Sequence, residues 1–433
     1  MGTSTSMNLW TQYRSIPIVY RIGAAFVLGS LVGLIVGEPA TVLQPLGDLF
    51  VQLLSMIVIP IVVFTLIMGI RQLDPTTLGK VGGQVVVLYA ITSSIAVFIG
   101  LTVANVVNPG QGLTLTEAEV DTEATPGIIE VLLGIVPEEP IGAMAEGDVL
   151  ATMFFALVFG LALALLRDAT DDPQIREGAE TIFNIMETAS EALFKIVWGI
   201  MEYGVIGVFA LMAAVFGEAG PDALVSFGLL IGAMLVACLI HIAITHLGGL
   251  IMLLTQQSPI AFLVGSKEAL ITALSIRSSA GTLPVTMSNA EDNLRINEGV
   301  YGFSLPLGAT INMDGTAMYQ GVAAIFAANL VGVSLSITEQ LMVVGIAVLA
   351  SIGSAGVPGT GLIMLTLVLT QLGLPLEVVG FVAGVDPILD RLRTMVNISG
   401  DLAVATVVGH WNGAVDFGAG VWDGTEIGVP TGD

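Results

Sequence analysis

Cysteine and charge are both scarce in this chain of 433 residues. Its single cysteine, Cys238, lies in an apolar run, which excludes a disulfide framework and any metal site built from several cysteines. Charged residues make up 11% of the chain, whereas about 25% is usual in soluble domains. Hydrophobic residues make up 55%, so most of the chain cannot face water. We therefore expect a polytopic membrane protein that lies in a lipid bilayer.

Basic residues are especially few, because 12 Lys and Arg stand against 36 Asp and Glu, a formal net charge of −24. That sign excludes a nucleic-acid partner, since phosphates are bound by clustered Lys and Arg. A phosphate-binding GxxxxGK[ST] loop is missing as well, because the nearest fragment, at Gly79 and Lys80, lacks both the loop and the hydroxyl. No nucleophile and base pair is visible, so we expect neither an ATP-driven pump nor an enzyme.

Six apolar runs are long enough to cross about 30 Å of hydrocarbon. They are residues 16–36, 46–70, 85–107, 149–166, 196–216 and 224–254. Every second connection between them carries Lys or Arg, and the alternate connections 37–45, 108–148 and 217–223 carry only acidic charges. Because basic loops stay on the inner side of a membrane, this pattern predicts a cytoplasmic N-terminus.

After about residue 258 the apolar stretches become short and are broken by Gly, Ser and Pro. Segments 341–352 and 362–372 would each reach only about 17 Å as helices, at about 1.5 Å per residue. Joined by residues 353–361 they predict a re-entrant helical hairpin, and residues 259–290 predict another around a tip at 277–284. The two tips resemble each other, which indicates inverted repeats around a site at the bilayer midplane.

Each predicted hairpin is followed by a span with a polar break, at residues 312–316 and 397–401. The first break supplies an acid, an amide and a hydroxyl, whose oxygens suit a hard cation such as Na+. A kink with satisfied polar groups is the alternative interpretation. At the hairpin tips, free N–H groups at the start of the second arms, near Pro284 and residues 359–361, favour a carboxylate.

The last span carries a polar stripe on one helical face. Its members are Asp386, Asp390, Arg393, Thr394, Asn397 and Asp401. A charge near the bilayer centre costs at least about 2.5–3.5 kcal/mol, so these groups need a partner or a ligand. A structural ion network between helices is the alternative. By contrast, His241 and His246 are five residues apart on an apolar helix, which is poor spacing for a shared metal ion, so packing or structural hydrogen bonding is expected.

Four motifs in this order resemble the dicarboxylate/amino acid:cation symporter family, the glutamate transporters, and in particular its archaeal sodium/aspartate symporters. The motifs are SSAGTLPVT, LPLGATINMDGTAMYQG, ASIGSAGVPGTGLIML and RTMVNISGDLA. The resemblance covers nearly the whole chain after the first dozen residues. It implies an all-α membrane protein with eight transmembrane helices and two re-entrant hairpins, assembled as a homotrimer whose transport domains move like elevators.

The resemblance also implies binding residues. Those for the substrate are Arg277, Ser278, Ser279, Thr316, Gly356, Val357, Gly361, Asp390, Arg393, Thr394 and Asn397. Three Na+ ions are implied: one at Gly308, Asn312, Asn397 and Asp401; one at Thr310, Ser351, Ile352 and Ser354; and one at Tyr89, Thr92, Ser93, Asn312 and Asp314. Gln320 stands where relatives that export K+ carry a glutamate, and an amide cannot titrate.

These expectations combine into a sodium-coupled symporter in the plasma membrane that imports aspartate or glutamate without K+ counter-transport. Asp390 would hold the substrate ammonium and Arg393 its side-chain carboxylate. Alternatives are a proton-coupled C4-dicarboxylate carrier, in which Asp390 would repel the substrate, and a substrate-gated anion channel. The expected organisation is six N-terminal helices in residues 1–257, a transport core with two hairpins and two interrupted helices in 258–415, and an acidic tail in 416–433.

Overall fold

The computed structural model describes residues 15–71, 80–111, 136–352 and 359–423, together with Tyr13 and Leu133. Every regular segment within these ranges is a helix, and an isolated β-bridge pairs Ile296 with Val415. The first half contains α2 (Ile18–Val36), η1 (Glu38–Leu43), α3 (Gln44–Met56), α4 (Val58–Arg71), α5 (Lys80–Val107), α7 (Pro140–Glu146), α8 (Val149–Ala169) and α9 (Pro173–Ala219). The second half contains α10 (Asp222–His241), η2 (Ile242–Thr255), α11 (Pro259–Ile276), α12 (Ser279–Ser288), η3 (Asn289–Asn293), α13 (Glu298–Ile311), α14 (Asp314–Leu330), α15 (Ile337–Ile352), α16 (Thr360–Gln371), α17 (Glu377–Trp411) and η4 (Gly420–Asp423).

The helices agree with an all-α membrane protein. Among the described residues, six helical stretches are long and apolar enough to cross a membrane. They include α11, which the sequence predicts as one arm of a hairpin. Length and composition alone therefore do not separate a true span from a hairpin arm.

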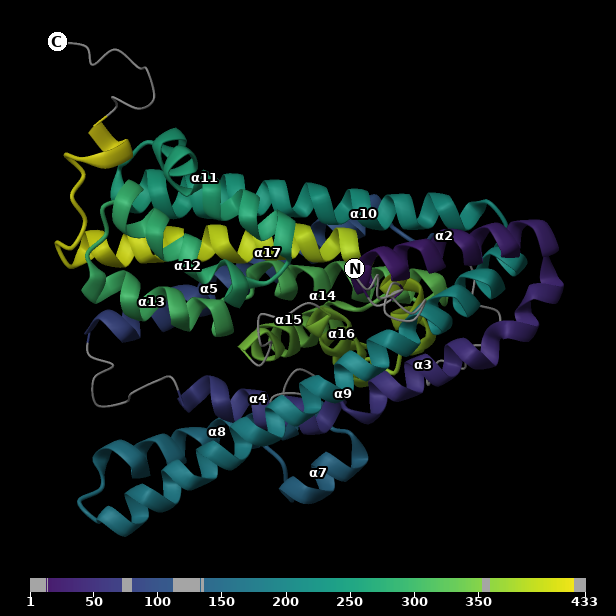
Figure 1. Ribbon diagram of the computed structural model, residues 1–433, viewed down its shortest axis with the longest axis horizontal. Helices are drawn as coiled ribbons and strands as arrows, with labels where there is room; N and C mark the ends of the chain where they lie inside the picture. Colours follow the sequence, from purple (N-terminus) through teal and green to yellow (C-terminus); the bar gives the residue numbers. More distant parts are fainter. Residues whose placement is uncertain are drawn as a thin grey trace, which may run out of the picture.

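The helices form two groups that lie side by side (Figure 1). In the first group, the long helix α9 packs along α2, α3, α4 and α8. In the second, α17 and α14 are surrounded by α5, α10, η2, α11, α13 and α16. The groups meet where α17 contacts α2, α3 and α9, and where α16 contacts α3 and α4. The functional side chains described below lie in the second group, and Arg277, Gly359 and Asp386 lie at this boundary.

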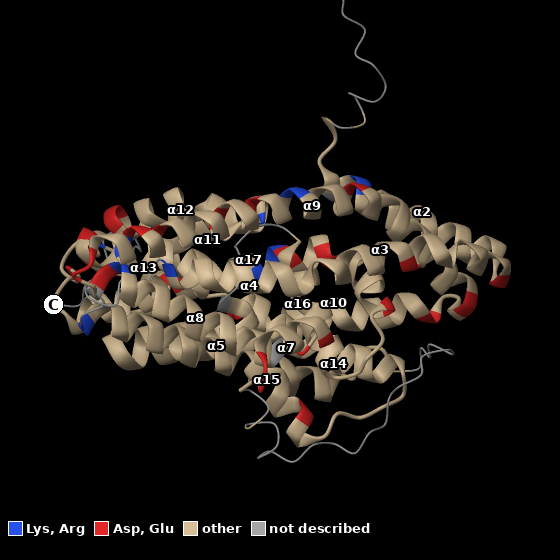
Figure 2. Ribbon diagram, turned by 90° about the horizontal axis from the view of Figure 1, so that it is seen from below, with Lys and Arg blue, Asp and Glu red and all other residues tan. Residues whose placement is uncertain are grey.

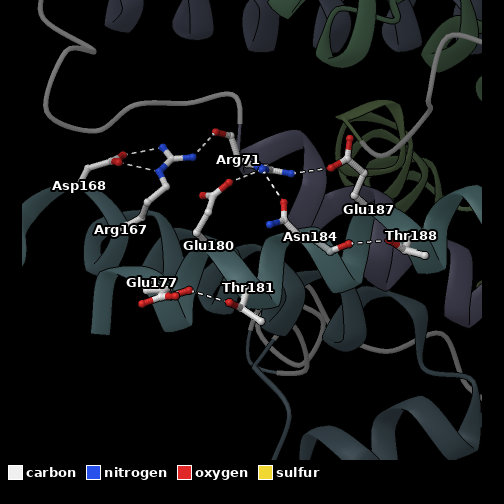
Figure 3. A network of polar contacts seen from close by, with 9 residues as sticks. All are labelled: Arg71, Arg167, Asp168, Glu177, Glu180, Thr181, Asn184, Glu187 and Thr188. Atoms are coloured by element: carbon white, nitrogen blue, oxygen red, sulfur yellow. Dashed lines mark hydrogen bonds and ion pairs between the residues drawn. The ribbon is translucent and has the colours of Figure 1, made fainter. Parts of the chain in front are cut away.

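Charge is distributed unevenly along the long axis of the molecule. The end where α2 turns into α3 and α9 turns into α10 carries Glu38, Glu218 and Asp222, and these connections contain no Lys or Arg (Figure 2). A mixed network ties α4 and α8 to α9 (Figure 3). There Arg71 donates to Glu180, Asn184 and Glu187, and Arg167 pairs with Asp168 and donates to the Arg71 carbonyl oxygen at 2.9 Å. Arg71 and Arg167 border two connections that the sequence predicts on the same side, and they lie together.

The first predicted hairpin is formed by α11 and α12, which pack against each other. Ser258 caps the start of α11 by accepting from the Ala261 N–H, and Arg277 ends it in the left-handed region with φ 56°. Ser278 then caps α12 by accepting from the Gly281 N–H at 3.0 Å. The turn is therefore only two residues long, and Pro284 lies inside α12 rather than at its start, because the Ser278 cap starts the second arm five residues earlier.

The second predicted hairpin has arms α15 and α16, which contact each other. Residues 353–358 at its tip lie outside the described residues. Between the hairpins, α13 ends at Ile311 and α14 begins at Asp314, so the predicted polar break is confirmed there.

The predicted interruption of the last span is wrong, because α17 continues without a break from Glu377 to Trp411. Its polar residues act through their side chains and leave the helical backbone intact. Asn397, for example, accepts from the Gly315 N–H of α14 with its side-chain oxygen at 2.8 Å. The start of the predicted acidic tail also folds onto the core: in η4, Val421 is buried and the Trp422 indole N–H donates to the Leu294 carbonyl oxygen at 2.8 Å.

Candidate functional site

The polar stripe of α17 lies inside the protein, on a single face as predicted. Its six members are between 1% and 7% exposed: Asp386, Asp390, Arg393, Thr394, Asn397 and Asp401. A buried charge is tolerated only when it is paired or hydrogen-bonded. The partners of each charge therefore indicate what this face can bind.

Arg393 is held by two carboxylates of its own helix. Its Nη1 donates to Asp386 Oδ1 at 2.7 Å and its Nη2 donates to Asp390 Oδ1 at 2.8 Å. The guanidinium carbon lies 4.3 Å from the centre of the Tyr319 ring, a cation–π arrangement. These donors are arranged as a fork that fits a carboxylate, so a ligand carboxylate can replace either aspartate.

The tip of the first hairpin brings a second arginine to the same place. Arg277 Nη1 forms an ion pair with Asp390 Oδ2 at 3.6 Å, so Asp390 lies between two guanidinium groups. Ser279, the first residue of α12, is buried beside this tip. Residues 275 and 274 accept from Arg391 through their carbonyl oxygens, which links the hairpin to α17.

Two glycines allow α14 and α16 to approach Arg393 closely. A Cβ atom at Gly315 would lie 2.3 Å from the Arg393 carbonyl oxygen, and one at Gly361 would lie 2.7 Å from its guanidinium carbon. Gln320 Nε2 donates to the Gly361 carbonyl oxygen at 3.4 Å, and Thr316 is buried one turn before it. The N-terminus of α16 therefore lies beside a guanidinium, and both favour an anion.

A cavity of about 200 Å³ opens beside this cluster, at the boundary of the two helix groups. The second group contributes Arg277, Gly359 and Asp386 to its wall. The first group contributes apolar side chains of α2 and α9, including Ile18, Ile22, Phe194 and Trp198. The charged cluster therefore borders a space that a small molecule can enter.

Two further carboxylates lie among hydroxyl and amide groups. Asp401 lies farther along α17, and Asp314 is the first residue of α14. Asp314 Oδ1 accepts from Ser93 at 2.7 Å and from Thr92 at 3.2 Å. Asp401 Oδ1 accepts from Asn312 Nδ2 at 2.8 Å. All five residues are buried, and within the described part of the chain no Lys or Arg contacts either carboxylate.

The backbone of α13 comes close to the Asp401 carboxylate. A Cβ atom at Gly308 would lie 2.3 Å from Asp401 Oδ1 and 2.6 Å from the Tyr89 hydroxyl. The Tyr89 hydroxyl donates to the Ser304 carbonyl oxygen at 2.9 Å. Gly308, Asn312, Asp401 and Tyr89, which the sequence assigns to two different Na+ sites, are thus brought together around one oxygen-rich point.

The second predicted Na+ site is described only in part. Ser351 is buried and donates to the Val348 carbonyl oxygen, and Thr310 donates to the Leu307 carbonyl oxygen. Their helices α13 and α15 are in contact. Ser354 lies outside the described residues, as do the predicted substrate residues Gly356 and Val357, and the side chain of Ile352 is not described.

Several residues at the site are missing from the ligands predicted from sequence. Asp386 belongs to the polar stripe, and its position seven residues before Arg393 was the available signal. Tyr319 carries no such signal, because one aromatic residue in an apolar helix usually packs in a core. His241 and His246 both contact Asp314, which confirms the structural hydrogen bonding expected of these two histidines.

The sequence matches a family of known proteins over most of its length. The sodium:dicarboxylate symporter family matches residues 18–411, from the start of α2 to the end of α17. The chain belongs to this family. The predicted resemblance is therefore confirmed, and the protein is a multi-pass membrane transporter rather than an enzyme.

Three relatives have names that differ in the substrate and in the coupled ion. The proton/sodium-glutamate symport protein of Bacillus subtilis (strain 168) is 34% identical over 407 residues, which cover 91% of this chain and 92% of the relative. The proton/glutamate-aspartate symporter of Escherichia coli (strain K12) is 33% identical, with 92% and 94% covered. The C4-dicarboxylate transport protein of Laribacter hongkongensis (strain HLHK9) is 31% identical, with 92% and 90% covered.

Proposed function

We propose that this protein is a sodium-coupled symporter that imports an acidic amino acid, aspartate or glutamate, across the plasma membrane. The observation that carries the proposal is the position of Arg393 between Asp386 and Asp390, beside Arg277 and the cavity. An acidic amino acid has two carboxylates and one ammonium, and this cluster offers both guanidinium and carboxylate groups.

Binding would then be an exchange of partners. The substrate side-chain carboxylate replaces an aspartate on the Arg393 guanidinium, and this releases Asp390 to hold the substrate ammonium. Ser278, Ser279, Thr316, Gly361, Thr394 and Asn397 would complete the site, together with Gly356 and Val357 at the second tip. Because partners are exchanged rather than created, the empty site keeps its charges paired between cycles.

Sodium would bind around Asp314 and Asp401. Support comes from the donor chemistry, because hydroxyl, amide, carboxylate and backbone oxygens suit a hard cation. The two carboxylates carry two negative charges, and a bound acidic amino acid adds one, so three Na+ ions would neutralise the loaded core. Three Na+ ions entering with one such substrate would move two net positive charges inward per cycle.

Movement would follow the boundary between the two helix groups. We propose that α2, α3, α4, α8 and α9 form a scaffold and that the remaining core moves against it as an elevator, in a homotrimer. The sequence divisions at residues 257 and 415 would then mark the start and end of the core that contains the two hairpins. The helices α5 and α10 would move with this core. The cytoplasmic N-terminus remains the proposed orientation.

Proton coupling and C4-dicarboxylate transport are the rival functions, since relatives carry these names. A C4-dicarboxylate has no ammonium to pair with Asp390, and the freed aspartate would repel it. Gln320 lacks a group that titrates, which favours a transport cycle in which the unloaded carrier returns without K+.

Uptake of labelled aspartate into proteoliposomes with imposed ion gradients tests the proposal. We expect accumulation with an inward Na+ gradient, equally well with K+ or choline inside at matched voltage. Equal accumulation when Na+ is replaced by choline under a proton gradient would contradict Na+ coupling. Preference for succinate over aspartate would contradict the assigned substrate.

A further inference from the structure

The Asp314 carboxylate faces two different kinds of partner. Its Oδ1 accepts from the hydroxyls of Thr92 and Ser93 on α5. Its Oδ2 lies 3.3 Å from His241 Nε2 and 3.2 Å from His246 Nε2. All three members of this second cluster are completely buried. The Na+ sites proposed above use oxygens only, so they leave the two imidazoles without a role.

An unusual helix brings the two histidines together. His241 ends α10, and His246 lies in η2, which is a π-helix from Ile242 to Thr255. In an α-helix, residues five apart point about 140° away from each other, because each residue turns about 100°. A π-helix bonds residue i to residue i+5 and so places such residues one above the other. The two ring centres are 4.5 Å apart, and both rings point to the same carboxylate oxygen.

The two His–Asp distances are close to those in a tetrahedral metal site. Zinc binds imidazole nitrogen at about 2.0–2.1 Å and carboxylate oxygen at about 2.0–2.2 Å, so neighbouring ligand atoms lie about 3.3 Å apart. The two His–Asp distances are 3.3 and 3.2 Å, whereas a charge-assisted N–H···O bond is usually about 2.7–2.9 Å. The three candidate ligand atoms lie within 4.8 Å of one another.

The surroundings support the same arrangement. His246 Nδ1 lies 3.0 Å from the Ser399 hydroxyl, and this contact orients the ring and leaves Nε2 for a ligand. A Cβ atom at Gly400 would lie 2.8 Å from Asn312 Nδ2, 3.0 Å from Asp314 Oδ2 and 3.2 Å from His246 Nε2, so glycine is what allows α17 to pack closely against the two candidate ligand atoms. His241 Nδ1 is buried and has no hydrogen-bond partner among the described residues.

We propose that His241 Nε2, His246 Nε2 and Asp314 Oδ2 form a binding site for one transition-metal cation of the Zn²⁺ class, with water as the fourth ligand. Imidazole and carboxylate together suit such a cation, whereas Na+ takes oxygen ligands. The site uses one oxygen of a carboxylate whose other oxygen is proposed to hold Na+. Bound Zn²⁺ therefore weakens Na+ binding, and Na+ weakens Zn²⁺ binding by the same factor. This antagonism rests on the proposed function, but the metal site itself does not.

Zinc binding to the full-length protein in lipid nanodiscs, in Na+-free choline buffer, tests the site directly. Titration calorimetry should show one Zn²⁺ per chain, and X-ray absorption should show nitrogen or oxygen ligands at about 2.0–2.1 Å including imidazole. His246→Gln should reduce the affinity at least 100-fold. Ser399→Ala retains both imidazoles and should reduce it about 10- to 100-fold, the usual effect of losing such a support.

Matched controls come from the same chain. His410 is the third histidine and lies exposed at the end of α17, so His410→Gln should bind zinc like the original protein, and so should Cys238→Ala. Binding that survives in His241→Gln and His246→Gln, or that is lost in His410→Gln, would overturn the site. Ser399→Ala tests the site without removing a histidine, so the test remains decisive even if the histidine variants misfold. Unchanged zinc affinity in Ser399→Ala would also count against the site.

Uptake measurements separate the two proposals. Micromolar Zn²⁺ should raise the Na+ concentration needed for half-maximal aspartate uptake in the original protein and much less in Ser399→Ala. If X-ray absorption detects bound zinc but zinc does not change the Na+ concentration needed for uptake, the metal site stands and Asp314 is not a Na+ ligand. Uptake that needs no Na+ would overturn the proposed function while the binding data still decide the metal site.

Discussion

The two ends of the polar region around α17 are balanced differently in charge. At one end, the buried Arg393 and the partly buried Arg277 face the buried Asp386 and Asp390, so two positive and two negative charges cancel. At the other end, Asp314 and Asp401 meet hydroxyl, amide and imidazole groups, and no Lys or Arg contacts them within the described residues.

This difference separates two tasks of a coupled transporter. The balanced end can stay empty at low cost and exchange an internal ion pair for a substrate. The unbalanced end buries negative charge, which is costly unless a cation neutralises it. Sodium coupling is therefore expected to originate at Asp314 and Asp401, and substrate selection at Arg393.

The largest expected effect comes from the unbalanced end. Asp401→Asn removes a carboxylate whose hydrogen-bond donor among the described residues is Asn312, and Na+ binding should weaken by about 2–5 kcal/mol, the scale for truncating one partner of a buried charge pair. Aspartate uptake and Na+-dependent aspartate binding measure this. Glu377→Gln, in the first turn of the same helix, is the matched control and should leave both unchanged. Normal Na+ dependence in Asp401→Asn would remove the basis of the comparison.

At the balanced end, Arg393→Cys should change selectivity rather than ion dependence. Loss of the guanidinium removes the partner of the substrate side-chain carboxylate, so aspartate affinity should fall by about 2–5 kcal/mol. The affinity for serine, which has a neutral side chain, should fall far less than that for aspartate, or should rise. Competition binding with both amino acids measures this. If Arg277→Ser loses the preference for aspartate and Arg393→Cys retains it, the selecting arginine lies on the hairpin.

Two glycines allow the ends to be disturbed separately. Gly361→Ala places a methyl group against the Arg393 guanidinium, and Gly308→Ala places one against Asp401, each at an expected cost of about 1–3 kcal/mol from overpacking. Gly361→Ala should weaken aspartate binding at saturating Na+, and Gly308→Ala should weaken Na+ binding. Gly345→Ala on α15 meets no atom within 4 Å and is the control. Identical defects in both variants would mean that the two ends do not act separately.

The smallest expected effect is that of Asp386→Asn. Asp386 holds Arg393 Nη1 at 2.7 Å and competes with the substrate carboxylate, so its removal should strengthen aspartate binding by about 1–2 kcal/mol, near the value of a hydrogen bond to a charged group. Calorimetry at fixed Na+ measures this. Weaker binding would show that Asp386 positions the arginine rather than competing for it.

The sequence was sufficient where a regular period carries the information. Steps of three and four residues place Asp390, Arg393 and Asn397 on one face of a helix, and the structure buries them together. Apolar length predicted the long helices, and a glycine next to an acid predicted the break between α13 and α14.

Other features depend on tertiary contacts that no local period reveals. Asn312, Asp314, Gly315 and Thr316 interrupt a helix, but the similar group at residues 397–401 lies within the unbroken helix α17, although side chains of both groups bond to neighbouring helices. The π-helix that brings His241 and His246 together packs against α17 and α11, and its apolar composition does not distinguish it from an α-helix. Tyr319 is identified only by the guanidinium that lies over it.

The central claim is that the unbalanced carboxylates couple substrate entry to Na+, and charge counting tests it most directly. Uptake of labelled Na+ and labelled aspartate is measured in the same proteoliposomes, together with the voltage that stops net uptake. The account predicts three Na+ ions and two net positive charges per aspartate, which gains about 2.3 kcal/mol per charge for each 100 mV of inside-negative potential. Electroneutral uptake, or accumulation of aspartate without any movement of Na+, would contradict it.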